Sequence, residues 1–141
     1  MGWTGAEAWI FLSIGDAARR APATLDKVIG MADSNNHSIP NLHEFEEAVS
    51  QLLGAGYITA TAGRYGLTRP GQRLYDKINS RKQGHIIRFV ETAELWRRKA
   101  PSGAGPIPWT ADAEEFLQAL EEYRRWFANT YEKLKERRSE S

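Results

Sequence analysis

The chain has 141 residues, of which 41% are hydrophobic and 26% are charged, and it contains no cysteine. This composition disfavours wholesale disorder and excludes disulfides, thiolate metal sites and cysteine nucleophiles. The net charge of +1 hides a partition, because residues 1–67 carry a net −3, residues 68–100 a net +6 and residues 101–141 a net −2. Positive charge is therefore concentrated in the middle of the chain.

The first apolar segment indicates a buried helix rather than a targeting signal. Residues 6–19 carry an apolar surface that is too wide for a surface helix. Its large apolar side chains are Trp9, Phe11, Leu12 and Ile14. The apolar run is too short to span a membrane, and no basic region precedes it. We therefore expect a cytoplasmic protein without a membrane segment.

Two further helices follow, each with its own start signal. Pro22 ends the first helix, and Thr24 is the expected N-cap of a short second helix. Asn41 followed by Glu44 has the pattern of a capping box, which predicts the start of a third helix. That helix runs for about four turns and ends at the glycines that begin with Gly54.

Residues 57–67 predict a two-stranded hairpin, since aromatic and β-branched residues flank a turn at Ala62 and Gly63. Thr68 is the expected cap of the next helix, which is bent or broken near Gly84.

A linker divides the end of the chain. Residues 100–108 contain three prolines and two glycines. We divide the chain into a domain of residues 1–80 and a helical extension of residues 81–141, which packs with the domain or forms a dimer interface. Thr110 is expected to open the final helix, whose acidic residues lie near its start and basic residues near its end.

Three helices followed by a hairpin is the order of a winged helix, and a local motif adds to it. Residues 52–58 read Leu-Leu-Gly-Ala-Gly-Tyr-Ile, and residues 65–71 read Tyr-Gly-Leu-Thr-Arg-Pro-Gly. Residues 6–80 therefore resemble the winged helix-turn-helix domain of bacterial MarR-like and PadR-like regulators. The expected fold class is mainly α with a small two-stranded β-hairpin, a winged helix-turn-helix domain followed by a C-terminal helical extension.

This resemblance implies a non-enzymatic DNA-binding transcriptional regulator, with residues 41–53 as the recognition helix. That helix presents His43, Ser50 and Gln51 as candidate base contacts. It also presents three glutamates, which DNA phosphates repel. The alternative is a winged-helix module that binds another protein and does not bind DNA.

The candidate phosphate contacts lie outside the recognition helix. They are Arg64 in the wing, followed by Arg69, Arg73, Lys77 and Arg81, which recur every four residues. Such an array suits a phosphate backbone, because each neutralised phosphate releases counterions. The competing interpretation is an ordinary solvated helix face.

The final helix predicts a homodimer. Apolar residues recur at steps of four and three, the spacing of a coiled-coil seam, with only Thr130 polar. The expected interface residues are Phe116, Leu120, Tyr123, Trp126, Phe127 and Leu134. MarR-like and PadR-like regulators dimerise through helices outside the winged motif, which favours the same conclusion. The alternative is that this helix folds back on its own domain.

No catalytic motif is present, and we predict neither a metal nor a cofactor. His37, His43 and Glu47 are the only residues with a spacing that suggests metal ligands, and no second metal motif supports them. Five aromatic residues have two possible roles, and the sequence does not decide between them. They either line a pocket for an effector molecule or belong to the core and to an interface. They are Trp96, Trp109, Trp126, Phe127 and Tyr131.

Overall fold

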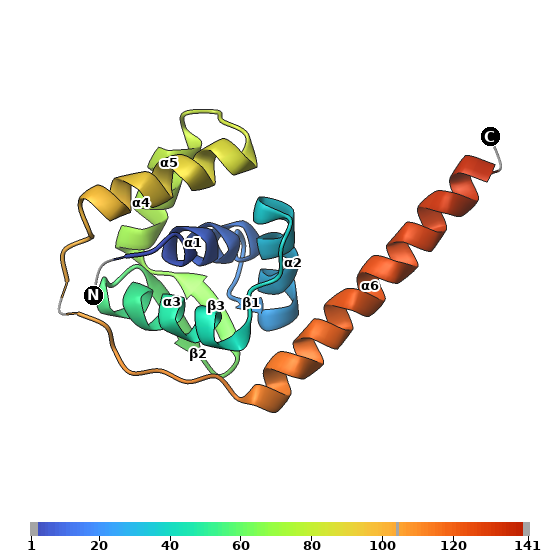
Figure 1. The fold of residues 1–141 in the computed structure, drawn as a ribbon, viewed down its shortest axis with the longest axis horizontal. Helices are drawn as coiled ribbons and strands as arrows, with labels where there is room; N and C mark the ends of the chain where they lie inside the picture. The colour runs from blue at the N-terminus through green and yellow to red at the C-terminus, as the bar shows by residue number, and fades with distance from the viewer. Residues whose placement is uncertain (1–2, 104, 140–141) are drawn as a thin grey trace.

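The computed structural model describes residues 3–103 and 105–139. This part of the chain is mainly helical, as expected, with six helices, a small three-stranded antiparallel sheet and a long C-terminal helix that projects from the rest (Figure 1). In chain order the elements are α1 (Ala6–Ala17), β1 (Ala23–Thr24), α2 (Leu25–Asn36), α3 (Leu42–Gly54), β2 (Ile58–Thr61), β3 (Arg64–Leu67), α4 (Arg69–Asn79), α5 (His85–Arg98) and α6 (Ala113–Ser139). No described helix is both long and apolar enough to cross a membrane.

Helix α1 forms the centre of the core. Its residues from Glu7 to Asp16 are all buried, and it packs against α2, α3 and α5. The ring of Phe11 lies 5.8 Å from that of Tyr57 and 5.5 Å from that of Trp96, between centroids. The sequence prediction of a buried first helix is therefore confirmed.

Several local start and stop signals act as the sequence predicted. Asn41 and Glu44 form the capping box of α3, each side chain accepting a hydrogen bond from the backbone N–H of the other. Thr68 caps α4 by accepting from the N–H of Gly71. The polypeptide leaves the helical conformation after α4 and begins α5 with Gly84 as its N-cap, so the two are separate helices.

The expected two-stranded hairpin is present as β2 and β3, and a third strand that was not predicted extends it to a three-stranded sheet. Ala62 and Gly63 form the turn with φ values of 53° and 72°, the left-handed backbone that a tight hairpin turn requires. The third strand, β1, pairs with β3 and places Ala23 opposite Tyr65, giving the order β1-β3-β2. A strand of two residues is too short to produce an alternating pattern, so the sequence carried no signal for it.

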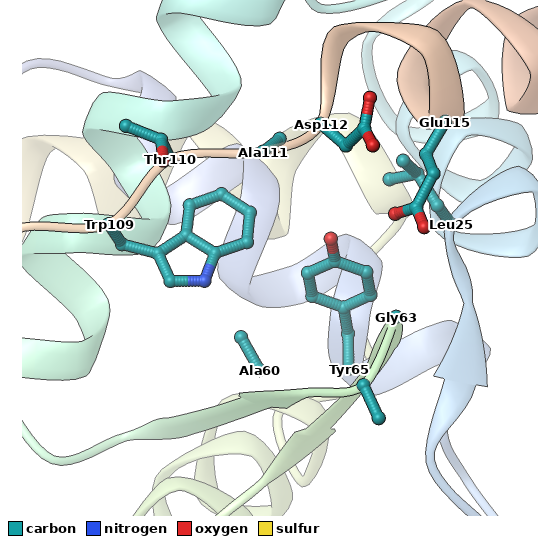
Figure 2. A pocket seen from close by; sticks show the side chains of 10 residues that line it. Leu25, Ala60, Gly63, Tyr65, Trp109, Thr110, Ala111, Asp112 and Glu115 are labelled. Carbon is teal, nitrogen blue, oxygen red and sulfur yellow. The ribbon is translucent and has the colours of Figure 1, made fainter.

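Residues 105–112, which we call the strap, lead into α6 and run past α3 and the hairpin (Figure 1). Trp109 anchors the strap, because its ring packs edge-on against Phe45 at 5.9 Å and Tyr65 at 6.1 Å between centroids. Figure 2 shows Trp109 and Tyr65 side by side. Trp109 therefore holds the strap against α3 and β3.

Helix α6 begins at Ala113, later than the expected start at Thr110. Asp112 occupies the capping position instead, since its side chain accepts from the N–H of Glu114 and its carbonyl accepts from the N–H of Phe116.

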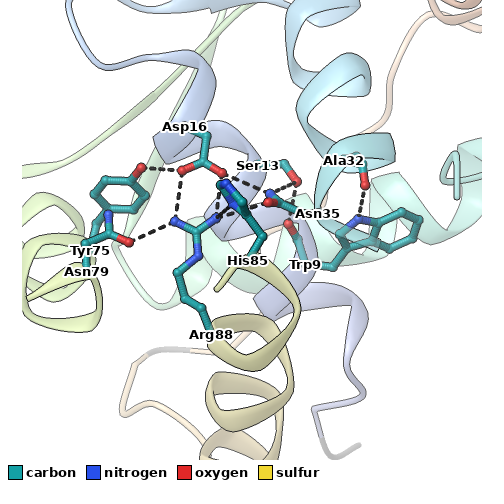
Figure 3. Close-up of polar contacts among 9 residues, drawn as sticks. All are labelled: Trp9, Ser13, Asp16, Ala32, Asn35, Tyr75, Asn79, His85 and Arg88. Atoms are coloured by element: carbon teal, nitrogen blue, oxygen red, sulfur yellow. Dashed lines mark hydrogen bonds and ion pairs between the residues drawn. The ribbon is translucent and has the colours of Figure 1, made fainter. Parts of the chain in front are cut away.

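A buried ion pair joins α1 to α5 (Figure 3). The guanidinium of Arg88 donates to both carboxylate oxygens of Asp16, at 3.0 and 2.6 Å, and the two side chains are only 4% and 5% exposed. Asn35 of α2 donates to Asp16 at 3.0 Å and accepts from Arg88 at 3.1 Å. The hydroxyl of Tyr75 in α4 also donates to Asp16. One ion pair therefore connects four helices.

These donors keep Asp16 ionised. Burial alone raises the pKa of a carboxyl group. The hydrogen bonds from Arg88, Tyr75 and Asn35 lower the pKa of Asp16 by more than burial raises it, so this pKa lies below its ordinary value. The same group has a pKa of about 3.9 in an unfolded chain. Asp16 therefore stabilises the fold fully above that pH, and this contribution is lost as the pH falls through the lower folded-state pKa.

We expect Arg88→Met to lower the free energy of unfolding by about 3–5 kcal/mol at pH 7, because it leaves a carboxylate buried without a cation. Urea denaturation measures this loss. The difference from the parent protein should shrink in acid as Asp16 becomes protonated.

The matched control for this experiment is Arg81→Met, since the ion pair of Arg81 with Glu91, at 3.7 Å, is exposed. We expect the control to change stability by no more than about 0.5 kcal/mol. Equal losses in Arg88→Met and Arg81→Met would contradict the role given to the buried pair.

Candidate functional site

The outward row of α3 is the surface that a recognition helix would present to DNA. It consists of His43, Glu47, Ser50 and Gly54, which follow one another at helical spacing opposite the buried face of α3. His43 and Glu47 are exposed, and the Nε2 atom of His43 lies 3.1 Å from a carboxylate oxygen of Glu47. Gln51 is half-buried on the flank of this row. The exposed half of the row therefore offers a carboxylate where DNA presents phosphates.

The strap covers the other half of this row. The hydroxyl of Ser50 donates to the carbonyl of Ile107 at 2.6 Å, and the N–H of Ile107 donates to the carbonyl of Ser50 at 3.1 Å. At Gly54 the backbone of the strap lies so close that a Cβ atom would overlap the carbonyl oxygen of Gly105. With the strap in this position, Ser50 is not available for contact with a base.

The basic stripe expected on the next helix is shorter than predicted. Arg69, Arg73 and Lys77 lie on α4, are exposed, and form no ion pair with a described residue. Arg81 lies beyond the end of α4 and pairs with Glu91.

The wing residue Arg64 is separated from this stripe. It begins β3 at the hairpin turn, whereas Arg69 follows the other end of that strand. Four residues of extended chain span roughly 13 Å, so the cations form two groups rather than one.

The seam predicted along α6 is divided in two. Phe116 and Tyr123 are buried, with 3% and 8% exposure, and they pack on the first part of the chain. The ring of Phe116 lies 5.8 Å from that of Phe45, and the Tyr123 hydroxyl donates to Asp33 at 2.6 Å. Leu120, between them, is partly buried against the core. The first half of α6 is therefore folded back on the rest of the chain.

The second half of α6 exposes its apolar side chains. Trp126 is 60% exposed, Phe127 52% and Leu134 53%. Beside them, a groove of about 840 Å³ lies between α2 and α6, and Met31 and Tyr131 contribute to its lining. Three of the five aromatic residues singled out in the sequence line this groove, whereas Trp96 is buried and Trp109 belongs to the strap.

Exposed apolar side chains on α5, interspersed with the ion-paired Glu91 and Glu94, were not predicted. Ile86, Ile87, Val90 and Leu95 are between 49% and 57% exposed. The buried residues of α5 include Arg88, Thr92 and Trp96, which recur at steps of four. The signal available in the sequence was this spacing, but a helix face that begins with arginine looks like a solvent face.

The described residues contain no group of three or more His, Asp or Glu side chains placed to hold a metal ion. The polar cluster around Asp16 and Arg88, which sequence reasoning missed, is buried and almost fully hydrogen-bonded within the protein, with only Nε of Arg88 lacking a partner. This arrangement suits a structural role.

Comparison with models of known protein families, with curated proteins and with solved structures found no match. The likeness to MarR-like and PadR-like regulators therefore rests on the residues of this chain.

Proposed function

We propose that this chain is a non-enzymatic winged-helix protein that acts through protein–protein contacts, first with a second copy of itself. The winged-helix assignment is supported by three helices that precede the β2–β3 hairpin, and by β1, which pairs with that hairpin. A winged helix that binds DNA places a recognition helix in the major groove. In this chain the helix that corresponds to the recognition helix is α3, which directly precedes the hairpin.

The observation that carries this proposal is the state of α3. Its outward row starts with a paired histidine and glutamate and ends beneath the strap, where Ser50 and Ile107 exchange two hydrogen bonds. Entry into a major groove would require the strap to leave and would bring Glu47 towards the phosphates. Both changes oppose binding, because hydrogen bonds are broken and like charges approach each other.

The surfaces that suit a protein partner lie on α5 and α6. Of the eleven large apolar side chains that are exposed in the described chain, nine belong to these two helices. Exposed apolar side chains gathered in this way are typical of interaction surfaces, protein–protein contacts among them. These nine side chains are between 49% and 60% exposed.

A second copy is the partner that α6 favours. Phe127, Thr130 and Leu134 keep the spacing of a two-helix seam, and a two-fold dimer buries the same face of both copies. This exposed half is too short to pair by itself, so the groove beside α2 contributes the remaining contact area.

A second candidate function is a DNA-binding transcriptional regulator, favoured by the exposed cations of α4. Arg69, Arg73 and Lys77 are placed along one helix and are not neutralised by a described acidic residue. In this case the protein contacts the phosphate backbone through α4 and Arg64, without base contacts from α3.

We expect the intact chain to be a dimer by light scattering and Phe127→Glu to be a monomer with an unchanged circular dichroism spectrum, because the substitution places a charge in an apolar interface. Asn129→Glu adds the same charge to another side of α6 and should leave the dimer intact. A monomeric parent protein, or a well-folded Phe127→Glu dimer, would remove this face from the interface.

Fluorescence anisotropy with a random-sequence DNA duplex distinguishes the two functions. The proposed function predicts no binding tighter than about 100 µM, the weak end of ordinary nonspecific affinity, even at low salt. The second candidate predicts binding that weakens steeply with salt. In that case Arg73→Glu combined with Lys77→Glu should lower the affinity for all sequences and reduce the salt slope by about 2. Tight binding that survives both reversals would contradict both assignments.

A further inference from the structure

A small cavity of about 340 Å³ lies where the strap crosses the hairpin (Figure 2). Its walls come from the β2–β3 hairpin, the first residue of α2, the strap and the first turn of α6. This volume lies within the range of small-molecule sites, which are concave and combine apolar walls with a few polar groups.

Tyr65 supplies an unsatisfied polar group to this cavity. Its side chain is only 4% exposed, and its hydroxyl has no hydrogen-bond partner among the described residues. Figure 2 shows this hydroxyl directed towards the space between Trp109 and Glu115. Among the described residues Arg88 Nε is the only buried side-chain polar atom without a partner, so solvent reaches the Tyr65 hydroxyl through the cavity, and this hydroxyl offers hydrogen-bonding capacity that the protein does not use.

The charge of the lining selects the ligand. Asp112 and Glu115 line the cavity, and none of its lining residues is Lys, Arg or His. One carboxylate oxygen of Asp112 caps α6 by accepting from the N–H of Glu114, whereas Glu115 has no such role in the cap and is the carboxylate that we assign to the ligand. Burial, together with the charge of Glu115, raises the pKa of Tyr65 to about 12, so its hydroxyl stays protonated at neutral pH.

Aromatic rings complete the preference for a cation. Trp109 and Tyr65 both line the cavity, and the faces of such rings attract ammonium and guanidinium groups. Glu115 is exposed, so a neutral ligand leaves its carboxylate hydrated, whereas a cationic ligand gains a charge-assisted hydrogen bond with it.

We propose that this cavity binds a small organic cation of the amidinium or primary ammonium class. Glu115 pairs with the positive charge, the Tyr65 oxygen accepts an N–H from the ligand, and the ring of Trp109 stacks on it. This site is separate from the protein contacts proposed above and does not depend on them.

The test uses benzamidine and its neutral counterpart benzamide, with the full chain and nuclear magnetic resonance. The chain has five tryptophans, and Trp109→Phe identifies the indole N–H signal of Trp109 by its disappearance. We expect benzamidine to shift this signal saturably, with a Kd on the order of 0.1–1 mM for a ligand of this size. Benzamide should bind at least about tenfold more weakly, because it cannot form the charge-assisted pair.

Two variants assign the contacts. Glu115→Gln should weaken benzamidine binding by about tenfold, and Tyr65→Phe should weaken it while keeping the ring. Glu122→Gln removes an equal charge elsewhere on the exposed surface of α6 and should leave the Kd unchanged. The proposal is overturned if benzamide binds as tightly as benzamidine, if Glu115→Gln keeps the parent affinity, or if no saturable shift occurs up to about 10 mM, well above that range.

Discussion

A charge inside a protein has to be paired, and the pairing of Asp16 with Arg88 governs much of this structure. Asp16 lies on the central helix, so the arginine that neutralises it must enter the core. That requirement determines which side of α5 faces inward, and Thr92 and Trp96 follow Arg88 at the same helical spacing. Ile86 and Val90 are then directed to solvent. The apolar surface that we assign to a partner is therefore a consequence of a buried ion pair.

The strap imposes a second constraint, on α3. Trp109 is fixed between aromatic rings at one end, and the glycine at position 54 allows the backbone to approach α3 at the other. Between these points, Ser50 and Ile107 hold the strap on the outward row. The same segment also forms one wall of the small cavity and leads into α6. A change at the cavity or in the position of α6 would therefore act on the surface of α3.

Sequence patterns predicted the parts of this structure that depend on local chemistry. The capping box at Asn41 and the cap at Thr68 depend on residues three positions apart, so they could be identified without the fold. The seam of α6 was identified correctly as apolar, but spacing cannot tell whether the partner is the same chain or another one. In the structure, Phe116 and Tyr123 are buried against other elements of their own chain.

Contacts between distant residues could not be predicted in this way. Asp16 and Arg88 are 72 positions apart, and each looks like an ordinary charged residue in its own helix. The cover over α3 depends on the path of a segment rich in proline and glycine, whose composition predicts a linker but not its location. For this reason the prediction for Ser50 was wrong. Its side chain was expected to face DNA, but it donates a hydrogen bond to the strap instead.

Amide hydrogen exchange at Ile107 measures whether the strap stays on α3 in solution. The N–H of Ile107 donates to the carbonyl of Ser50, so we predict exchange at least about tenfold slower than in an unstructured peptide. Gly54→Ala should remove this protection, because the added methyl group displaces the strap. If Ile107 in the parent protein exchanges at the unstructured rate while amides of the helical core are protected, the strap does not cover α3 in solution.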